Sequence, residues 1–165
     1  MFSVGRATSS LTQRPDRYGT GHVQLSSIDL STVGDFDADR VLVGGSLKIR
    51  VTFKSRVNTR HLELFLWFVD ELSCRSTYLS NRLTGTRVAA TLGGGAATCR
   101  IPTVGLTPGN YTIDAAIAVG GEVADFIHGA CSLSVDSGPF FATGRTPLRE
   151  HGTHLTKHEW IGDDA

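Results

Sequence analysis

The chain has 165 residues, a length that favours one domain with a core large enough to need no disulfide or metal staples. Its 16 Lys and Arg residues balance its 16 Asp and Glu residues, so the formal net charge is zero. Nucleic-acid binders and polybasic membrane anchors both carry a basic excess, so this balance argues against both classes. No apolar stretch approaches the length of about 20 residues that spans a bilayer, so we expect no direct membrane insertion.

The N-terminal segment and the cysteines both favour a cytoplasmic protein. Residues 1–19 are polar and lack the apolar region of a signal peptide, and we predict that they form a disordered leader or linker. The three widely spaced cysteines, Cys74, Cys99 and Cys131, do not make a disulfide framework. A bridge between Cys99 and Cys131 on neighbouring strands is the alternative to three reduced thiols.

Alternating apolar residues predict strands from residue 23 onward. In the segment 23–30 the alternation slips by one residue at Ser26-Ser27, a pattern that indicates a β-bulge. The segment 47–54 alternates without a break, and its charged face carries Lys48 and Arg50. This pattern predicts a strand with one buried face and one solvated face.

The strand predicted at 62–69 is apolar on both faces. Leucines and Phe68 line one side, and Phe65 and Trp67 line the other. A strand of this kind must be covered on both sides, by the core and by a second partner.

Further short strands are predicted at 40–43, 75–80, 98–102, 111–119 and 123–135, with turns at Pro108-Gly109 and Gly120-Gly121. Many short strands joined by Gly and Pro turns predict an all-β, immunoglobulin-like antiparallel β-sandwich. We expect the sandwich core to span residues 20–138. Residues 139–165 form a tail that we expect to end in a strand.

The sequence contains no recognisable catalytic apparatus. His151, His154 and His158 have a spacing that could hold a metal on a helix, but Gly152 and the neighbouring threonines make a helix unfavourable here. The nucleophile-elbow, phosphate-loop and dinucleotide-binding motifs are all missing from the sequence. We therefore predict a non-enzymatic protein without a metal or cofactor. A small metal or hydrolytic enzyme that uses the tail histidines is a weaker alternative.

Aromatic side chains on an outward strand face could form a ligand platform. Aromatic rings stack on the apolar faces of sugar rings, while charged and amide side chains bond the hydroxyl groups. The candidate ligand-binding residues are Phe65, Trp67, Lys48, Arg50, Tyr78, Asn81 and Arg82. In the alternative, Phe65 and Trp67 pack under a loop or against another subunit, and the sandwich serves protein interaction or dimerisation without sugar binding.

The order of several motifs resembles one known family. The segments GTGHVQLSSIDL, VLVGGSLKIRVTFKSR and LELFLWFVD follow one another, and a turn of the form L-x-P-G-x-Y spans residues 106–111. Together with the closing segment 151–160, these pieces resemble the carboxyl-terminal domain of Wzt proteins, the ATPase subunits of ABC transporters that export O-antigen polysaccharide.

The resemblance implies a non-catalytic domain that recognises an O-antigen-type polysaccharide in the cytoplasm before export. Its implied partners are the glycan and the ATPase and membrane subunits of an inner-membrane ABC transporter. It also implies a homodimer in which the last strand is exchanged between subunits, and the tail from residue 139 is long enough for such an exchange.

Overall fold

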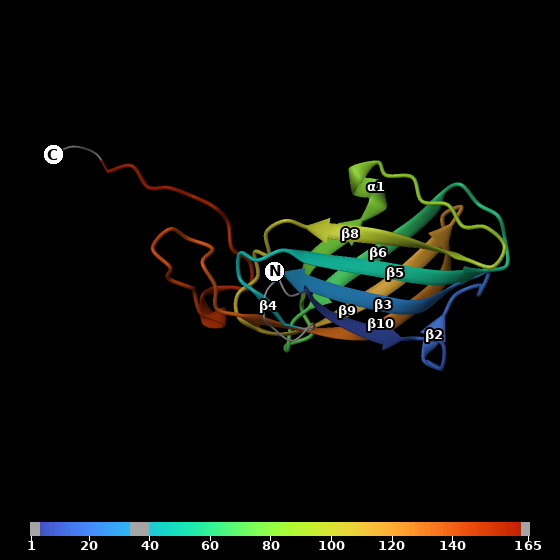
Figure 1. Cartoon of the computed structure of the whole chain (residues 1–165), viewed down its shortest axis with the longest axis horizontal. Coiled ribbons are helices and arrows are strands. Elements are labelled where there is room, and N and C mark those ends of the chain that lie inside the picture. Colours follow the sequence, from blue (N-terminus) through green and yellow to red (C-terminus); the bar gives the residue numbers. More distant parts are fainter. Residues whose placement is uncertain (1–3, 34–39, 163–165) are drawn as a thin grey trace.

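The computed structural model describes residues 4–33 and 40–162 (Figure 1). Strands dominate the order of elements along the chain. The elements are β1 (Val4–Ser10), β2 (Arg17–Tyr18), β3 (Val23–Val33), β4 (Arg40–Leu42), β5 (Leu47–Ser55), β6 (Leu62–Val69), β7 (Arg75–Ser80), α1 (Asn81–Thr84), β8 (Gly95–Ile101), β9 (Gly109–Val119), β10 (Glu122–Asp136) and the 3₁₀ helix η1 (Arg149–His151).

Two sheets pack face to face. One has four strands in the order β1-β3-β5-β8, and the other has six, in the order β2-β10-β9-β6-β7 with β4 alongside β10. The pairing of β4 with β10 is parallel, and the other strand pairs are antiparallel. The predicted all-β antiparallel sandwich is thereby confirmed.

The inward faces of β3, β5, β6 and β9 supply the centre of the core. Alternating residues of β5 are buried and exposed, as its sequence pattern predicted. The slip that predicted a bulge in β3 is also present, because the pairing of β3 with β5 shifts register between Leu25 and Ser27. The largest fully buried side chains include Phe53, Phe68, Ile28, Ile49, Ile113 and Ile117.

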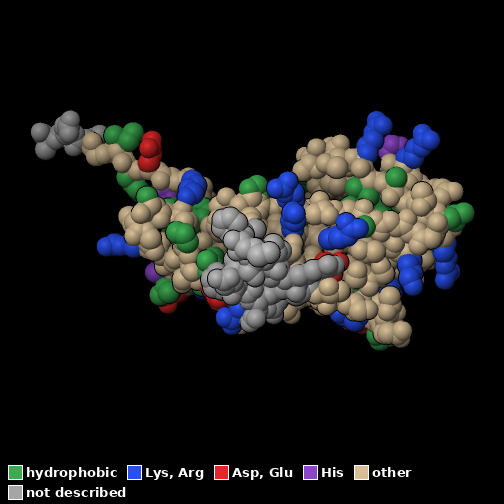
Figure 2. Space-filling view, viewed as in Figure 1, with side chains coloured by type: hydrophobic (Ala, Val, Ile, Leu, Met, Phe, Trp, Pro, Cys, Tyr) green, Lys and Arg blue, Asp and Glu red, His purple; other side chains and the backbone are tan. Residues whose placement is uncertain are grey.

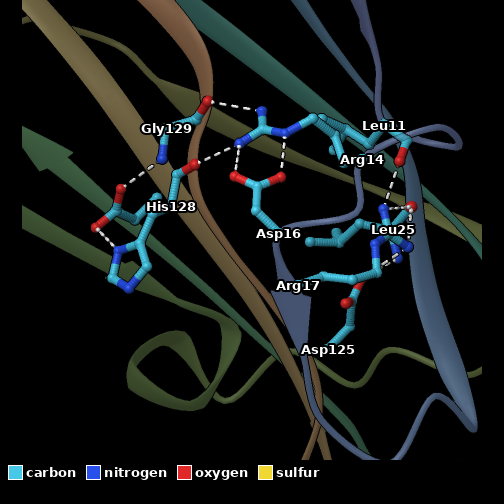
Figure 3. Close-up of polar contacts among 9 residues, drawn as sticks. Leu11, Arg14, Asp16, Arg17, Leu25, Asp125, His128 and Gly129 are labelled. Atoms are coloured by element: carbon cyan, nitrogen blue, oxygen red, sulfur yellow. Dashed lines mark hydrogen bonds and ion pairs between the residues drawn. The ribbon is translucent and has the colours of Figure 1, made fainter.

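The segment expected to be a disordered leader instead contains two strands. β1 pairs with β3 along its whole length, and β2 pairs with β10. Between them, Arg14 donates hydrogen bonds to the backbone oxygens of His128 and Gly129 while it pairs with Asp16 (Figure 3). These tertiary contacts order a segment whose polar composition predicted disorder. Residues 1–3 of that predicted leader lie outside the described part of the chain.

A second tie lies beside β2. The guanidinium of Arg17 donates to the backbone oxygens of Leu11 and Leu25 and lies 3.5 Å from a carboxylate oxygen of Asp125 (Figure 3). That carboxylate accepts a 2.7 Å hydrogen bond from the backbone nitrogen of Leu25. Because Leu25 belongs to the four-stranded sheet and Asp125 to the six-stranded sheet, this cluster joins the two sheets.

The turn before β9 is closed by a tyrosine. The hydroxyl of Tyr111 donates a 2.8 Å hydrogen bond to the backbone oxygen of Thr107, four residues earlier. Pro108 lies in a bend, and Gly109, with a φ of 155°, is already the first residue of β9, so the tight Pro108-Gly109 turn that the sequence predicted is replaced by a bend. The L-x-P-G-x-Y pattern therefore marks a corner at which the chain enters the second sheet.

The tail differs from its prediction. After β10 the chain first packs on the end of the sandwich, where Phe140 and Leu155 are buried in the core, and its last described residues then extend away (Figure 1). The strand expected near the end is absent from the described residues of the tail. A single bridge pairs His154 with Leu106, and Trp160 is exposed. Residues 163–165 of the predicted tail lie outside the described part. Among the described residues, no helix has the length and apolar character needed to cross a membrane.

Candidate functional site

Five rings form a continuous row on the outer face of the six-stranded sheet. We call this the aromatic row: Tyr18 on β2, Phe126 on β10, Phe65 and Trp67 on β6, and Tyr78 on β7. The strand register brings these residues together, because Phe126 lies opposite Tyr18 and Trp67 lies opposite Tyr78.

Small residues of β9 lie beneath the row. Ala116 stands between Phe65 on one neighbouring strand and Phe126 on the other. Ala116, Ala118 and Phe126 are all buried, yet none belongs to the core cluster between the sheets. Ala116 therefore lies between the rings of Phe65 and Phe126, while Glu63 and Val123 stand beside Ala118.

The rings stack on one another. The centroids of Tyr18 and Phe126 are 4.9 Å apart with planes at 11°, too close for two rings that lie side by side in one plane. Phe126 lies 5.6 Å from Trp67, and Trp67 lies 5.5 Å from Tyr78. The ring faces that point toward a neighbouring ring of the row are thus covered. The rings at the two ends are the most accessible, with Tyr18 57% and Tyr78 43% exposed.

Charged groups gather around the middle of the row. The guanidinium carbon of Arg75 lies 4.4 Å from the ring centroid of Trp67, an arrangement typical of a cation–π interaction. Arg75 also lies 4.0 Å from Asp114, whose carboxylate accepts from the backbone nitrogen of Gly129 and contacts Nδ1 of His128. The His128 ring in turn lies 4.5 Å from Phe126. Hydrogen-bonding groups therefore stand directly beside the rings.

Three predicted residues meet in this row. Phe65, Trp67 and Tyr78 contact one another as rings. Arg82 is exposed nearby and forms an ion pair of 3.6 Å with Glu63, which is on the same strand as Phe65 and Trp67. Arg82 therefore lies over the face of β6 that carries the rings.

Asn81 has a structural role instead. Its side-chain oxygen accepts from the backbone nitrogen of Leu64, and its side-chain nitrogen donates to the backbone oxygens of Leu62 and Thr86. These bonds occupy both ends of the amide, so Asn81 holds α1 and the following loop against β6.

Lys48 and Arg50 lie on the opposite side of the molecule. They are on β5, which pairs with β3 and β8 in the four-stranded sheet and not with β6. β5 is not a neighbour of β6, because β6 pairs with β7 and β9. These two cations and the aromatic row therefore cannot contact the same small ligand.

Sequence reasoning missed several residues of the site. Tyr18 lay in the predicted leader, and the two-residue strand β2 is too short to show an alternation. Phe126 lies in a part of β10 that is buried on both faces, so its sequence does not show which face it is on. For Arg75 and His128 the sequence predicted only that they lie in strands.

A cavity of about 630 Å³ opens between the edges of the two sheets. Its walls come from β6, β7, α1 and the loop after it on one side, and from β5 and β8 on the other. Leu64, Leu66 and Leu79 make it apolar inside, and Arg87 and Arg100 stand among its lining residues. Tyr78 lines it as well, so the cavity adjoins one end of the aromatic row.

The tail histidines do not converge. Within residues 4–33 and 40–162, no three side chains of the His, Cys, Asp or Glu type are grouped so that they could hold a metal ion. His151 accepts a hydrogen bond from the backbone nitrogen of Leu148, and His158 contacts the backbone oxygen of Thr156.

Comparisons with known proteins identify the family. Residues 14–147 match the family described as the Wzt C-terminal domain. The crystal structure of the C-terminal domain of Wzt is similar with a TM-score of 0.71 at 12% identity, covering 91% of this chain and 90% of that chain. A CARDB domain from Pyrococcus furiosus, solved with di-metal ions, is 15% identical over 78% of this chain and 95% of that chain, but its TM-score of 0.36 supports no inference. The comparison with curated protein sequences found no match.

The family match spans most of the chain, and the solved relative shares its fold. The resemblance seen in the sequence motifs is thereby confirmed. Domains of this family belong to O-antigen ABC transporters, in which they serve binding or regulation. The chain is a member of the Wzt C-terminal domain family.

Proposed function

We propose that this domain binds an O-antigen-type polysaccharide for export by an ABC transporter and catalyses no reaction. It would act in the cytoplasm, beside the ATPase and membrane subunits of an inner-membrane transporter. The observation that carries the proposal is the aromatic row, whose rings cover an outer sheet face where solvent would otherwise lie.

Recognition would start at the two ends of the row. A sugar ring binds an aromatic face through its apolar C–H groups, and the free faces belong to the exposed rings Tyr18 and Tyr78. Arg75, His128 and the Arg82–Glu63 pair stand beside the row and could exchange hydrogen bonds with hydroxyl groups. Binding of this kind involves no covalent step.

The test is a titration of the protein with O-polysaccharides from several bacteria, in which calorimetry or tryptophan fluorescence measures binding. Replacing Tyr18 or Tyr78 with Ala should weaken binding by roughly tenfold each, because truncation of an interface aromatic costs about 1–2 kcal/mol. Leu92→Ala is the matched control, because Leu92 is an exposed apolar side chain outside the row. If no polysaccharide binds, or if both tyrosine variants bind like the wild type, the proposal fails.

A second candidate function is dimerisation through the tail. Trp160 is 90% and Ile161 84% exposed, and both lie on the segment that extends from the sandwich (Figure 1). Large apolar side chains displayed in this way favour burial against a partner, and an exchanged tail between two copies would provide it. In this reading the chain forms a homodimer, with or without sugar binding.

Analytical ultracentrifugation separates the two functions. If the tail makes the dimer, Trp160→Ser combined with Ile161→Ser should shift the protein to monomer and leave glycan affinity per domain within about twofold. If the aromatic row is itself a protein contact, Trp67→Ala should change the oligomeric state. A wild-type protein that is monomeric at all concentrations would exclude the dimer.

A further inference from the structure

The balanced total charge conceals an uneven distribution. Three cations of β5 and one of β8 are exposed on the outer face of the four-stranded sheet, and Figure 2 shows Lys and Arg side chains over this side of the molecule. We call this set the basic face: Lys48, Arg50, Lys54 and Arg100. The only carboxyl residue in the sequences of the four strands is Asp29.

The cations of the basic face crowd one another. Lys48 lies directly opposite Arg100 in the register of β5 and β8, and Arg50 is the next outward residue along β5. Like charges placed directly opposite on a sheet destabilise it. None of the four cations forms an ion pair with a residue in the described part of the chain.

Several cations outside the basic face are neutralised locally. Six arginines outside the basic face lie within 4.0 Å of a carboxylate: Arg14, Arg17, Arg40, Arg75, Arg82 and Arg149. The fold thus pairs many of its charges yet leaves these four together, so an external anion would relieve their mutual repulsion.

The shape and chemistry of the face favour an extended anionic surface. From Lys48 to Lys54 the strand rises about 20 Å, which is too far for a single small anion. The outward neighbours of these cations are Asp29 opposite Arg50, and the uncharged Ser31, Gln24, Thr52 and Thr98, with no ring or large apolar side chain among them. A protein partner would usually need aromatic anchors, whereas lipid headgroups attract Lys and Arg without any insertion.

We propose that the basic face docks the domain on an anionic phospholipid bilayer through electrostatic attraction alone. The aromatic row lies on the opposite sheet and so would face away from the lipid, open to a glycan. This proposal does not depend on glycan binding, because the two faces share no residue. It requires only a negative membrane surface, of the kind that cytoplasmic leaflets present.

The experiment is flotation of the full chain with vesicles of phosphatidylcholine, with or without about 40% phosphatidylglycerol, at about 0.05 M salt. The wild type should float with the anionic vesicles alone and should be released at about 0.5 M salt. Each cation near such a surface contributes about fivefold in binding, so Lys48→Glu combined with Arg100→Glu should bind at least 20-fold more weakly.

The matched control is Arg60→Glu combined with Arg145→Glu, which changes the net charge equally at exposed positions outside the basic face. This variant should retain most of the binding, and thermal melting should show that both variants are folded. Equal loss in the two variants would show attraction by net charge alone and would overturn the proposal. The proposal would also be overturned if the wild type failed to float with anionic vesicles. A wild type that bound duplex RNA in a separate titration but did not bind lipid would overturn it as well.

Discussion

The three thiols of the chain differ sharply in their surroundings. Cys74 is exposed, Cys99 is half-buried in β8, and Cys131 is buried in β10. Burial raises the pKa of the Cys131 thiol to about 12 and also raises that of Cys99. Because the thiolate is the reactive form, we expect Cys74 to be alkylated first at neutral pH and Cys131 to be protected.

Mass spectrometry of peptides from the alkylated protein measures this order. All three cysteines should react at similar rates in denaturant, which serves as the control. Alkylation of Cys131 as fast as that of Cys74 in the native protein would contradict its burial. The same experiment tests the disulfide alternative, since all three thiols are free in the structure.

At the residue scale, the sequence predicted which face of a strand a side chain occupies, but it did not predict which residues of other strands lie beside that side chain. Period-two alternation correctly assigned Phe65 and Trp67 to the outward face of β6, because successive side chains of a strand point to opposite faces. The partners Tyr18 and Phe126 come from strands distant in sequence. Alternation within one strand carries no information on such pairing, so the row could not be predicted as a unit.

The use of Asn81 also needed the structure. Its three hydrogen bonds to backbone atoms hold α1 and the next loop on β6, so Asn81→Ala would leave the nitrogen of Leu64 without its partner. An unpaired backbone group of this kind costs about 1–3 kcal/mol. We expect the free energy of unfolding, measured with urea, to fall by that amount.

Its neighbour Arg82 provides the comparison for that measurement. Arg82 is exposed and makes a surface ion pair with Glu63, so Arg82→Ala should change the free energy of unfolding by no more than about 0.5 kcal/mol. If Asn81→Ala proved as stable as Arg82→Ala, the hydrogen bonds of the Asn81 side chain would contribute nothing to the stability of the fold.

At the scale of elements, strong periodic signals were reliable and composition was not. The bulge in β3 and the alternation of β5 appear where the sequence placed them. The N-terminal segment was expected to be disordered because it is polar, yet β1 finds its partner in the edge of β3. A polar strand gains its stability from tertiary pairing, which local composition does not register.

A glycine run illustrates the same limit. Three consecutive glycines at residues 93–95 are typical of a flexible loop tip, but a Cβ on Gly94 would stand 2.1 Å from the backbone oxygen of Phe53, and its φ is 138°. The glycine is needed for this close approach to β5. We expect Gly94→Ala to lower the free energy of unfolding in urea by about 1–3 kcal/mol. Gly93→Ala should lower it less, because a Cβ there meets no atom within 4 Å and only the φ of 103° is unfavourable for alanine.

At the scale of the whole molecule, the sequence predicted the class of fold but not the division of strands between sheets. Sandwich architecture follows from many short amphipathic strands, and the family motifs agreed with it. Whether β5 or β7 borders β6 depends on contacts between distant segments, and this choice decided which predicted residues share a face. As a consequence, the outer face of the six-stranded sheet is aromatic and the outer face of the four-stranded sheet is basic.

The two sheets are tied together by a buried carboxylate whose titration should be visible in stability. Burial of Asp125 raises its pKa, and this effect outweighs the hydrogen bond from Leu25 and the nearby Arg17, which act in the other direction. Between the ordinary value of about 3.9 and the raised value, the folded protein holds more protons than the unfolded chain. The contribution of Asp125 to the free energy of unfolding is therefore lost as pH rises through that window.

Comparison with Asp125→Asn isolates this contribution, because the amide keeps an oxygen acceptor for Leu25 and does not titrate. We expect the wild-type free energy of unfolding, minus that of the variant, to fall as pH rises above about 3.9 and then to level off. Urea unfolding of both proteins at a series of pH values measures it, since the other acidic groups cancel in the difference. A difference that grew with pH would mean that Arg17 and Leu25 outweigh burial and hold the folded-state pKa below its ordinary value.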